Sequence, residues 1–329
     1  MRRAFLKTAC AVAAIVATAI PASAADFTFK FAHAQPPTSV RHKSMELFKD
    51  NLEKASNGRI KVELFSGGAL GNEAELTDMV KMGSMQGTRG GAFAKANKKF
   101  LIYTLPFLFN DTDSVLKAMR SSFGADIAKH AEQNGYYIPA TGVAGGFRQI
   151  SNSKKPINTP DDVAGLKLRT PPIETIVKTM QALGASPQSI PYGETYMALK
   201  MGVVDGQENP PSNIVEMKFY EAQKYLSIVD YQIHPDPFIV NLKWYQSLPA
   251  DLKTIFDKAA KDAMVWSDTN WLASEASYME TLKKNMSVNA VSAENRAKFV
   301  AKVKPVWDGY VKDGTFTAAE IDAALKAGK

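Results

Sequence analysis

Three side chains able to hold a carboxylate stand where the predicted regular structure ends. Arg169 follows the alternating run LKL and precedes Thr-Pro-Pro, Asn209 comes directly before another Pro-Pro pair, and Arg148 has a similar setting within GGFRQISNS. A guanidinium presents a planar fork that meets a carboxylate with two parallel hydrogen bonds, which an ammonium group cannot do. At the carboxyl edge of an open α/β sheet, where ligands bind, these groups suit the capture of a small organic acid.

Each of these residues also has a structural alternative. Arg169 or Arg148 could belong to an internal ion pair, and Asn209 could simply cap the turn before the prolines. His33, at the end of the first predicted strand, could line a pocket, or could only cap the strand or face solvent. The sequence leaves these alternatives open.

The sequence patterns of catalytic and cofactor sites do not occur. The four histidines, His33, His42, His130 and His234, show no HExxH or other metal-ligand spacing. There is no GxSxG elbow, and the paired glycines do not form GxGxxG or GxxxxGK[ST]. We therefore expect that the protein is not an enzyme and needs neither a metal nor a cofactor. The rival reading is a secreted enzyme acting on organic acids, which would need a nucleophile, a metal or a tuned acid/base pair.

The first 24 residues predict a cleaved secretory signal. Arg2, Arg3 and Lys7 precede an apolar run over 9–20, and Ala-Ser-Ala at 22–24 fits a cleavage site. The single cysteine, Cys10, falls within this leader. No later segment approaches ~20 uninterrupted apolar residues. The mature chain is thus expected to begin near Ala25 and to be exported to the periplasm.

The charge balance gives no sign of a nucleic-acid partner. The chain has 40 basic and 33 acidic residues, and removing the leader's three basic residues leaves 37 against 33, about +4. This small excess is spread along the sequence, without a basic stripe or interleaved aromatic residues.

Strand-like runs alternate with helical patterns, which predicts an α/β fold. About 300 mature residues suffice for two domains. No linker separates them, so the chain is expected to cross between domains more than once. The last long helix could bridge the domains or carry a kink. The predicted strands cover 27–33, 60–65, 136–143, 167–169, 187–190 and 238–241, and the predicted helices cover 73–82, 113–133, 173–183, 192–201 and 252–284.

Several blocks, in order along the mature chain, resemble the solute-binding proteins of tripartite ATP-independent periplasmic (TRAP) transporters, of the C4-dicarboxylate-binding-protein type. These blocks include SNGRIKVELF, GGALGNEAEL, LPFLFND, GFRQISNSKKPINTPDDVAGLKLRTP and PYGETYMALKMGVVDGQENP. The resemblance implies a periplasmic-binding-protein-like fold, with two α/β domains around a ligand cleft, joined by crossing strands and a long helix. The implied domains are 25–145 with 235–274, and 146–234 with 275–329.

The resemblance also implies roles for particular residues. Arg169 would clamp the ligand carboxylate, Arg148 would assist, Asn209 would lie nearby, and Glu73 is a weaker candidate for the cleft lining. The ligand would be a small organic acid: a dicarboxylate, a sugar acid or a similar compound. The closed, liganded protein, expected to be a monomer, would dock on TRAP membrane permease subunits. A sensor that presents the ligand to a membrane receptor is the alternative.

One segment departs from the family pattern. Gln86 stands where the family often has an acid, and Arg89 and two glycines follow where a buried strand leads to the cleft. As a hypothesis, Arg89 adds a second positive group that favours a dicarboxylate or sugar diacid. The alternative is that Arg89 is a surface residue.

Overall fold

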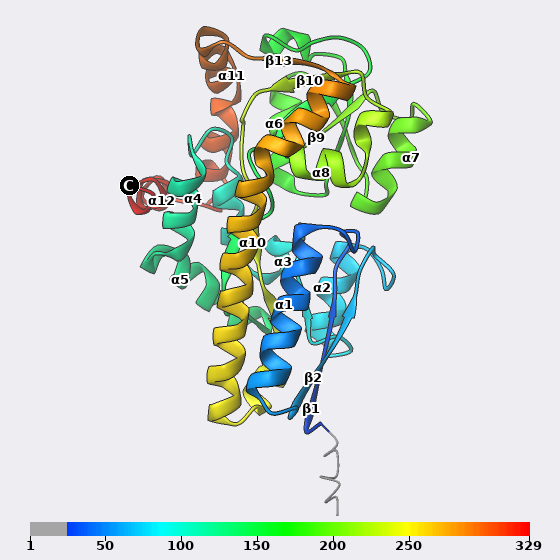
Figure 1. Ribbon diagram of the computed structural model, residues 1–329. Coiled ribbons are helices and arrows are strands. Elements are labelled where there is room, and N and C mark those ends of the chain that lie inside the picture. Colours follow the sequence, from blue (N-terminus) through cyan, green and yellow to red (C-terminus); the bar gives the residue numbers. More distant parts are fainter. Residues whose placement is uncertain (1–24) are drawn as a thin grey trace, which may run out of the picture.

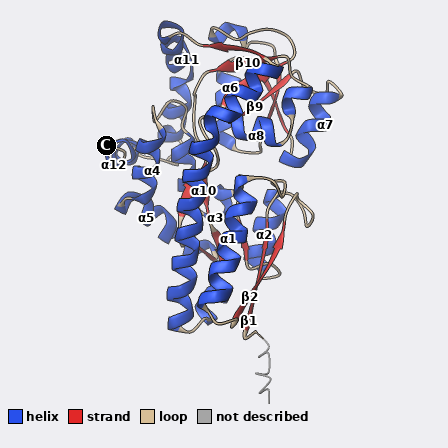
Figure 2. Ribbon diagram, in the orientation of Figure 1, coloured by secondary structure: helices blue, strands red, loops and turns tan. Residues whose placement is uncertain are grey.

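Two lobes, each built on its own β-sheet, make up the described chain, and one long helix runs along both (Figure 1). The computed structural model describes residues 25–329, so the predicted signal peptide lies outside the described residues. Helices cover the sheets of both lobes (Figure 2). The predicted two-domain α/β fold class is therefore confirmed.

The sheet of the first lobe is mixed. Its strand order is β2 (Ile60–Phe65), β1 (Phe27–Ala32), β3 (Gly87–Thr88), β12 (Ile239–Asn241) and β4 (Tyr136–Tyr137). Strand β1 pairs in parallel with β2 and β3, whereas β12 runs antiparallel to both its neighbours. Alternation along β1 buries Phe29, whose ring packs edge-on against Phe48 and Phe256 from two different helices.

Six α-helices accompany this sheet among the described residues. They are α1 (Val40–Ala55), α2 (Glu73–Met82), α3 (Phe93–Ala96), α4 (Thr112–Arg120), α5 (Ser122–His130) and α9 (Leu242–Ser247), with 3₁₀ turns at Lys98–Thr104 and Ala131–Asn134. Helix α2 matches the predicted range because Asn72 forms a capping box with Glu75, and Gly83 ends the helix in the left-handed conformation.

Two predicted elements of this lobe are interrupted. The helix expected over 113–133 breaks at Ser121, which adopts an extended conformation and caps the new helix α5 by accepting from the N–H of Gly124. The strand expected over 136–143 breaks near Pro139, which has no N–H to contribute to a ladder. Beyond it the chain leaves the first sheet as β5 (Thr141–Val143).

The second lobe has a six-stranded mixed sheet. Its order is β13 (Ser287–Ala290), β10 (Tyr225–Ile228), β6 (Gln149–Asn152), β9 (Gly206–Asn209), β7 (Lys167–Thr170) and β8 (Ser186–Ser189). Its helices are α6 (Glu174–Ala182), α7 (Thr195–Lys200), α8 (Pro211–Glu216) and α11 (Ala293–Lys312), with 3₁₀ turns at Pro160–Asp162, Tyr192–Glu194 and Phe219–Glu221.

The chain passes between the lobes several times. Strand β5 leads out of the first lobe, β11 (Pro235–Pro237) leads back, and the two form an antiparallel pair. Helix α10 (Ala250–Asn285) packs against α1 of the first lobe and α8 of the second. The last helix, α12 (Ala318–Ala327), returns to α4 of the first lobe. The crossing strands and the bridging helix thus have the expected arrangement.

The strands of the two sheets fall within the domain ranges given above, 25–145 with 235–274 and 146–234 with 275–329. Helix α12 contacts the first lobe although its residues lie in the second range. The boundaries themselves remain a prediction. Within residues 25–329, no helix combines the length and the apolar character needed to cross a membrane.

Candidate functional site

A small cavity between the lobes collects buried polar groups from both. It measures about 30 Å³, and in this closed arrangement Arg148, Arg169 and Asn209 are each at most 3% exposed. Larger hollows of roughly 510–550 Å³ lie elsewhere, but the residues lining them do not include these groups. The polar lining of the interlobe cavity consists of Gln35, Arg41, Glu73, Arg148, Arg169, Tyr192, Asn209, Asn213 and His234.

Arg169 is the cation best placed to meet a ligand. It lies on β7, and its Nε donates to the carbonyl of Ile190 at 2.9 Å. Among the residues that the structure describes, its Nη2 has no hydrogen-bond partner and its guanidinium joins no ion pair. Burial lowers the pKa of Arg169 to about 10, which reflects how poorly the closed cavity solvates this charge. An anion entering the cavity would supply the missing partner.

Arg148 lines the same cavity, but an internal acid already neutralises its charge. Its Nε and Nη2 both donate to the carboxylate of Glu208, and Nη2 also donates to Oδ1 of Asn209 at 3.0 Å. Glu208 and Asn209 end strand β9, which pairs with β6, and Arg148 directly precedes the first residue of β6. Arg148 therefore forms the internal ion pair that the sequence left open as an alternative, and it also lies in the cavity wall.

Asn209 links this pair to the other lobe. Its Oδ1 accepts from Nδ2 of Asn213 at 2.9 Å, and Oδ1 of Asn213 accepts from Nε2 of Gln35 at 3.1 Å. Gln35 belongs to the first lobe, so a chain of amide groups spans the cavity from one lobe to the other. Tyr192 adds a long contact to Gln35 at 3.5 Å.

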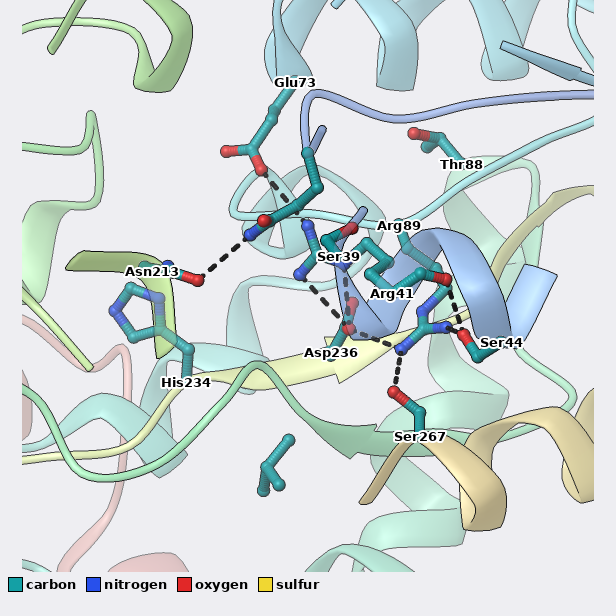
Figure 3. Close-up of polar contacts among 12 residues, drawn as sticks. Ser39, Arg41, Ser44, Glu73, Thr88, Arg89, Asn213, His234, Asp236 and Ser267 are labelled. Atoms are coloured by element: carbon teal, nitrogen blue, oxygen red, sulfur yellow. Dashed lines mark hydrogen bonds and ion pairs between the residues drawn. The ribbon is translucent and has the colours of Figure 1, made fainter. Parts of the chain in front are cut away.

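Arg41, which the sequence reasoning did not select, is the cation contributed by the first lobe. It lies on α1, is 8% exposed, and points into the cavity between Asp236 at 3.2 Å and Glu73 at 3.8 Å (Figure 3). In the sequence, Arg41 is a single basic residue near the start of an amphipathic helix. No local signal distinguishes it from a basic residue on the solvent-exposed face of such a helix.

Glu73 has its place because two glycines leave room for it. It is the first residue of α2 and lines the cavity. A Cβ added to Gly90, whose φ is +158°, would lie 2.5 Å from one Glu73 carboxylate oxygen, and one on Gly91 would lie 2.8 Å from the other. The Gly90-Gly91 pair therefore serves to seat a carboxylate at the cavity wall.

The expectation for Arg89 requires correction. Arg89 is neither on the surface nor among the residues that line the cavity; it is 1% exposed and its Nη2 pairs with Asp236 at 2.7 Å. Its guanidinium also donates to the hydroxyls of Ser44 and Ser267 (Figure 3). Its charge is already matched inside the protein, so it does not provide a second cation for a dicarboxylate.

Two further residues have structural roles. Gln86, at the departure from the family pattern, accepts from the N–H of Lys30 and donates to the carbonyl of Gly83, so it joins β1 to the turn after α2. His33 does not line the interlobe cavity. Its Nε2 lies 3.0 Å from Nδ1 of His42, and its ring is tilted against that of Phe31.

The buried imidazoles predict acid sensitivity. Burial, and then the charge of Arg41, lowers the pKa of His33 to about 2, and burial with Arg148 and Arg169 keeps the pKa of His234 well below its ordinary value. Because both stay neutral when folded but accept protons below about pH 6.5 when unfolded, stability is lost as the pH falls through that value. Between pH 7 and pH 5.5, each histidine that stays neutral in the folded state should lower the free energy of unfolding by about 1 kcal/mol.

Urea titrations at the two pH values, compared between wild type and His33→Gln, would measure this effect. The variant should lose about 1 kcal/mol of the pH dependence. An unchanged pH dependence would contradict the assignment of a neutral buried His33. The comparison also cancels the opposing contribution of Asp268, whose pKa burial raises to about 6.

Chemically, the site offers guanidinium, amide, phenol and carboxylate groups from two lobes that face one small volume. Among residues 25–329, no group of three or more His, Cys, Asp or Glu is placed to hold a metal ion. The arrangement is suited to gripping an anion with hydrogen-bonding substituents.

Comparisons with known proteins show which family this chain resembles. The profile of "Bacterial extracellular solute-binding protein, family 7" (DctP) matches residues 31–313. The C4-dicarboxylate-binding periplasmic protein DctP of Rhodobacter capsulatus is 30% identical over 328 residues, covering 96% of this chain and 95% of its own.

Solved structures with the same fold include complexes with different acids. The sugar acid binding protein DctPAm of Advenella mimigardefordensis, in complex with galactonate, aligns with a TM-score of 0.87 at 28% identity, over 92% of this chain and 97% of its own. A TRAP periplasmic solute-binding protein of Sulfurospirillum deleyianum with bound succinate aligns with a TM-score of 0.86 at 25% identity, over 93% and 100%.

Proposed function

This chain belongs to family 7 of the bacterial extracellular solute-binding proteins, the binding proteins of TRAP transporters, and we propose that it captures an organic acid in the interlobe cavity with Arg169 as the carboxylate clamp. Arg148 and Asn209 shape the second-lobe wall around that clamp, and Arg41 and Glu73 close the cavity from the first lobe.

The observation that carries this proposal is the state of Arg169. Its guanidinium is 1% exposed, and in the described part of the chain no acceptor contacts Nη2 and no acid pairs with it. A buried charge without a partner is costly, so the closed arrangement is favourable only when an anion completes it. A carboxylate can satisfy the guanidinium fork with two hydrogen bonds.

Ligand binding is thereby coupled to closure. The cavity wall needs residues from both lobes, whereas an open form would expose Arg169 to water. A ligand that binds the closed form more tightly shifts the population toward it. The crossing strands β5 and β11 are the short segments in which dihedral changes would permit such a hinge motion.

The proposal extends to location and partners. The relatives are periplasmic binding proteins, and TRAP transporters pair such proteins with membrane permease subunits. We place this chain in the same role: an exported protein that delivers its acid to a permease without chemical change.

A ligand screen tests the proposal. Mature protein, unfolded and refolded to remove any bound acid, would be heated with members of a panel of C4-dicarboxylates, aldonates, uronates and keto acids. One ligand class should give a large stabilisation, about 4 kcal/mol when its concentration is a thousand times Kd, and should be recovered unaltered. Native mass spectrometry of freshly purified protein should find an acid of that class. Absence of stabilisation by every acid, with no co-purifying acid, would contradict the proposal.

A further inference from the structure

The charged groups around the cavity divide into two sets, one on each lobe. In the second lobe, Arg148 and Arg169 face the single carboxylate of Glu208, and Glu208 is held by Arg148. This set therefore carries one excess positive charge, located on Arg169, whose Nη2 has no partner among residues 25–329.

The first-lobe set, which includes Asp236 on the crossing strand β11, is balanced. Two guanidiniums, Arg41 and Arg89, face two carboxylates, Asp236 and Glu73, and the four are linked in the row Glu73–Arg41–Asp236–Arg89 (Figure 3). Glu216, at the end of α8 in the second lobe, does not line this cavity; it lines an adjoining one with Arg41, and burial raises the pKa of its carboxyl, which favours the neutral form. Asp268 pairs with Arg120 at 2.6 Å.

A ligand with one carboxylate would bring the combined cavity to neutrality. A second carboxylate, directed from Arg169 toward the first lobe, would meet a balanced set that includes the Glu73 carboxylate. Burying a charge without a counter-charge is far less favourable than leaving it in water.

The rest of the lining suits hydroxyl groups. Gln35, Tyr192, Asn213 and His234 are uncharged donors or acceptors, and Glu73 can accept from ligand hydroxyls. These groups hydrogen-bond within the protein, but the amides of Gln35 and Asn213 keep further donor and acceptor capacity that hydroxyl groups of a ligand can use.

We propose that this protein selects hydroxylated monocarboxylates, and that Glu73 excludes a second carboxylate. This inference rests on the proposed function and narrows its ligand class. It reverses the preference expected from Arg89 as an additional cation, because Asp236 already takes up that charge.

Matched acids provide the test. Calorimetry would compare galactonate with galactarate, gluconate with glucarate, and erythronate with meso-tartrate. Each pair has the same carbon number and differs in whether the terminal carbon is a hydroxymethyl or a carboxylate. At least one monoacid should bind, with its diacid partner about a hundredfold weaker. A diacid, or succinate, that binds as tightly as the best monoacid would overturn the inference while leaving acid capture by Arg169 intact. If none of these acids binds, the inference fails; the proposed function fails as well only if the wider panel, including the keto acids, also contains no ligand.

A substitution assigns the effect to Glu73. Glu73→Gln keeps the size of the side chain beside Gly90-Gly91 and removes its charge, so the preference for the monoacid should fall at least about tenfold. Asp78→Asn, at an exposed position on the same helix, should leave the ratio unchanged. An unaltered ratio in Glu73→Gln would show that Glu73 does not discriminate between the two classes.

Discussion

Replacing Arg169 with alanine is expected to weaken binding of the captured acid by about a hundredfold or more, on the order of 3 kcal/mol. The reason is that Arg169 carries the excess positive charge of the second-lobe set and has no internal anion among the described residues. Truncation would leave the ligand carboxylate buried without its counter-charge. Titration calorimetry with the best ligand of the screen measures the change, and a loss below threefold would remove Arg169 from the site.

Two companion variants make this result specific. Arg169→Lys keeps a positive charge but loses the planar fork, so it should bind with intermediate affinity. Lys167→Ala, two residues earlier on the same strand and exposed, should bind as the wild type does. Ligand-free Arg169→Ala should be no less stable than the wild type, because no internal acid pairs with Arg169 in the described residues and the open form exposes its guanidinium to water. A structural role for Arg169 would instead lower that stability.

Asp236→Ala is expected to destabilise the fold by about 3–5 kcal/mol. Asp236 is 1% exposed and is the shared counter-ion of Arg41 and Arg89, at 3.2 and 2.7 Å. Its loss leaves two guanidiniums buried without this anion. Urea unfolding at neutral pH measures the effect. As a control, Asp262→Asn breaks an exposed ion pair with Lys258 and should change stability by less than about 0.5 kcal/mol. An equally small effect of Asp236→Ala would contradict the role given to this network.

The Asp236 carboxylate also makes the stability of the protein depend on pH. Burial acts to raise the pKa of Asp236, but Arg41 and Arg89 hold it below its ordinary value. A carboxyl whose folded pKa is depressed stabilises the protein above its unfolded pKa, near 4, and loses that contribution as the pH falls further. Wild type should therefore lose part of its advantage over Asp236→Ala below about pH 4.

Local signals predicted much of the fold. Helix α2 could be placed because Asn72, Glu75 and Gly83 mark both its ends within a few residues. The break at Ser121 also has a local signal, since serine is a favoured N-cap and glycine at 124 is a weak helix former, but the prediction of one helix over 113–133 did not use it. Elements, caps and breaks thus depend mainly on short-range chemistry, whereas contacts between distant segments cannot be found from local patterns.

For the candidate site, the same distinction applies. Arg169, Arg148 and Asn209 could be selected because each adjoins a recognisable break in regular structure, and the structure brings all three to one cavity. Arg41 and Asp236 are 195 residues apart and meet only through the fold. Arg89 was assigned the wrong environment for the same reason: its partner Asp236 is 147 residues away.

Helix α10 has a mechanical consequence for the molecule. Its 36 residues contain no glycine or proline, and a helix of that length extends about 54 Å. In Figure 1 the end of this helix over the second lobe is inclined to the part along the first lobe, so rotation of one lobe against the other would change the bend of a continuous helix. The helix would then resist opening of the two lobes elastically, and would favour their return to the resting angle after the ligand dissociates.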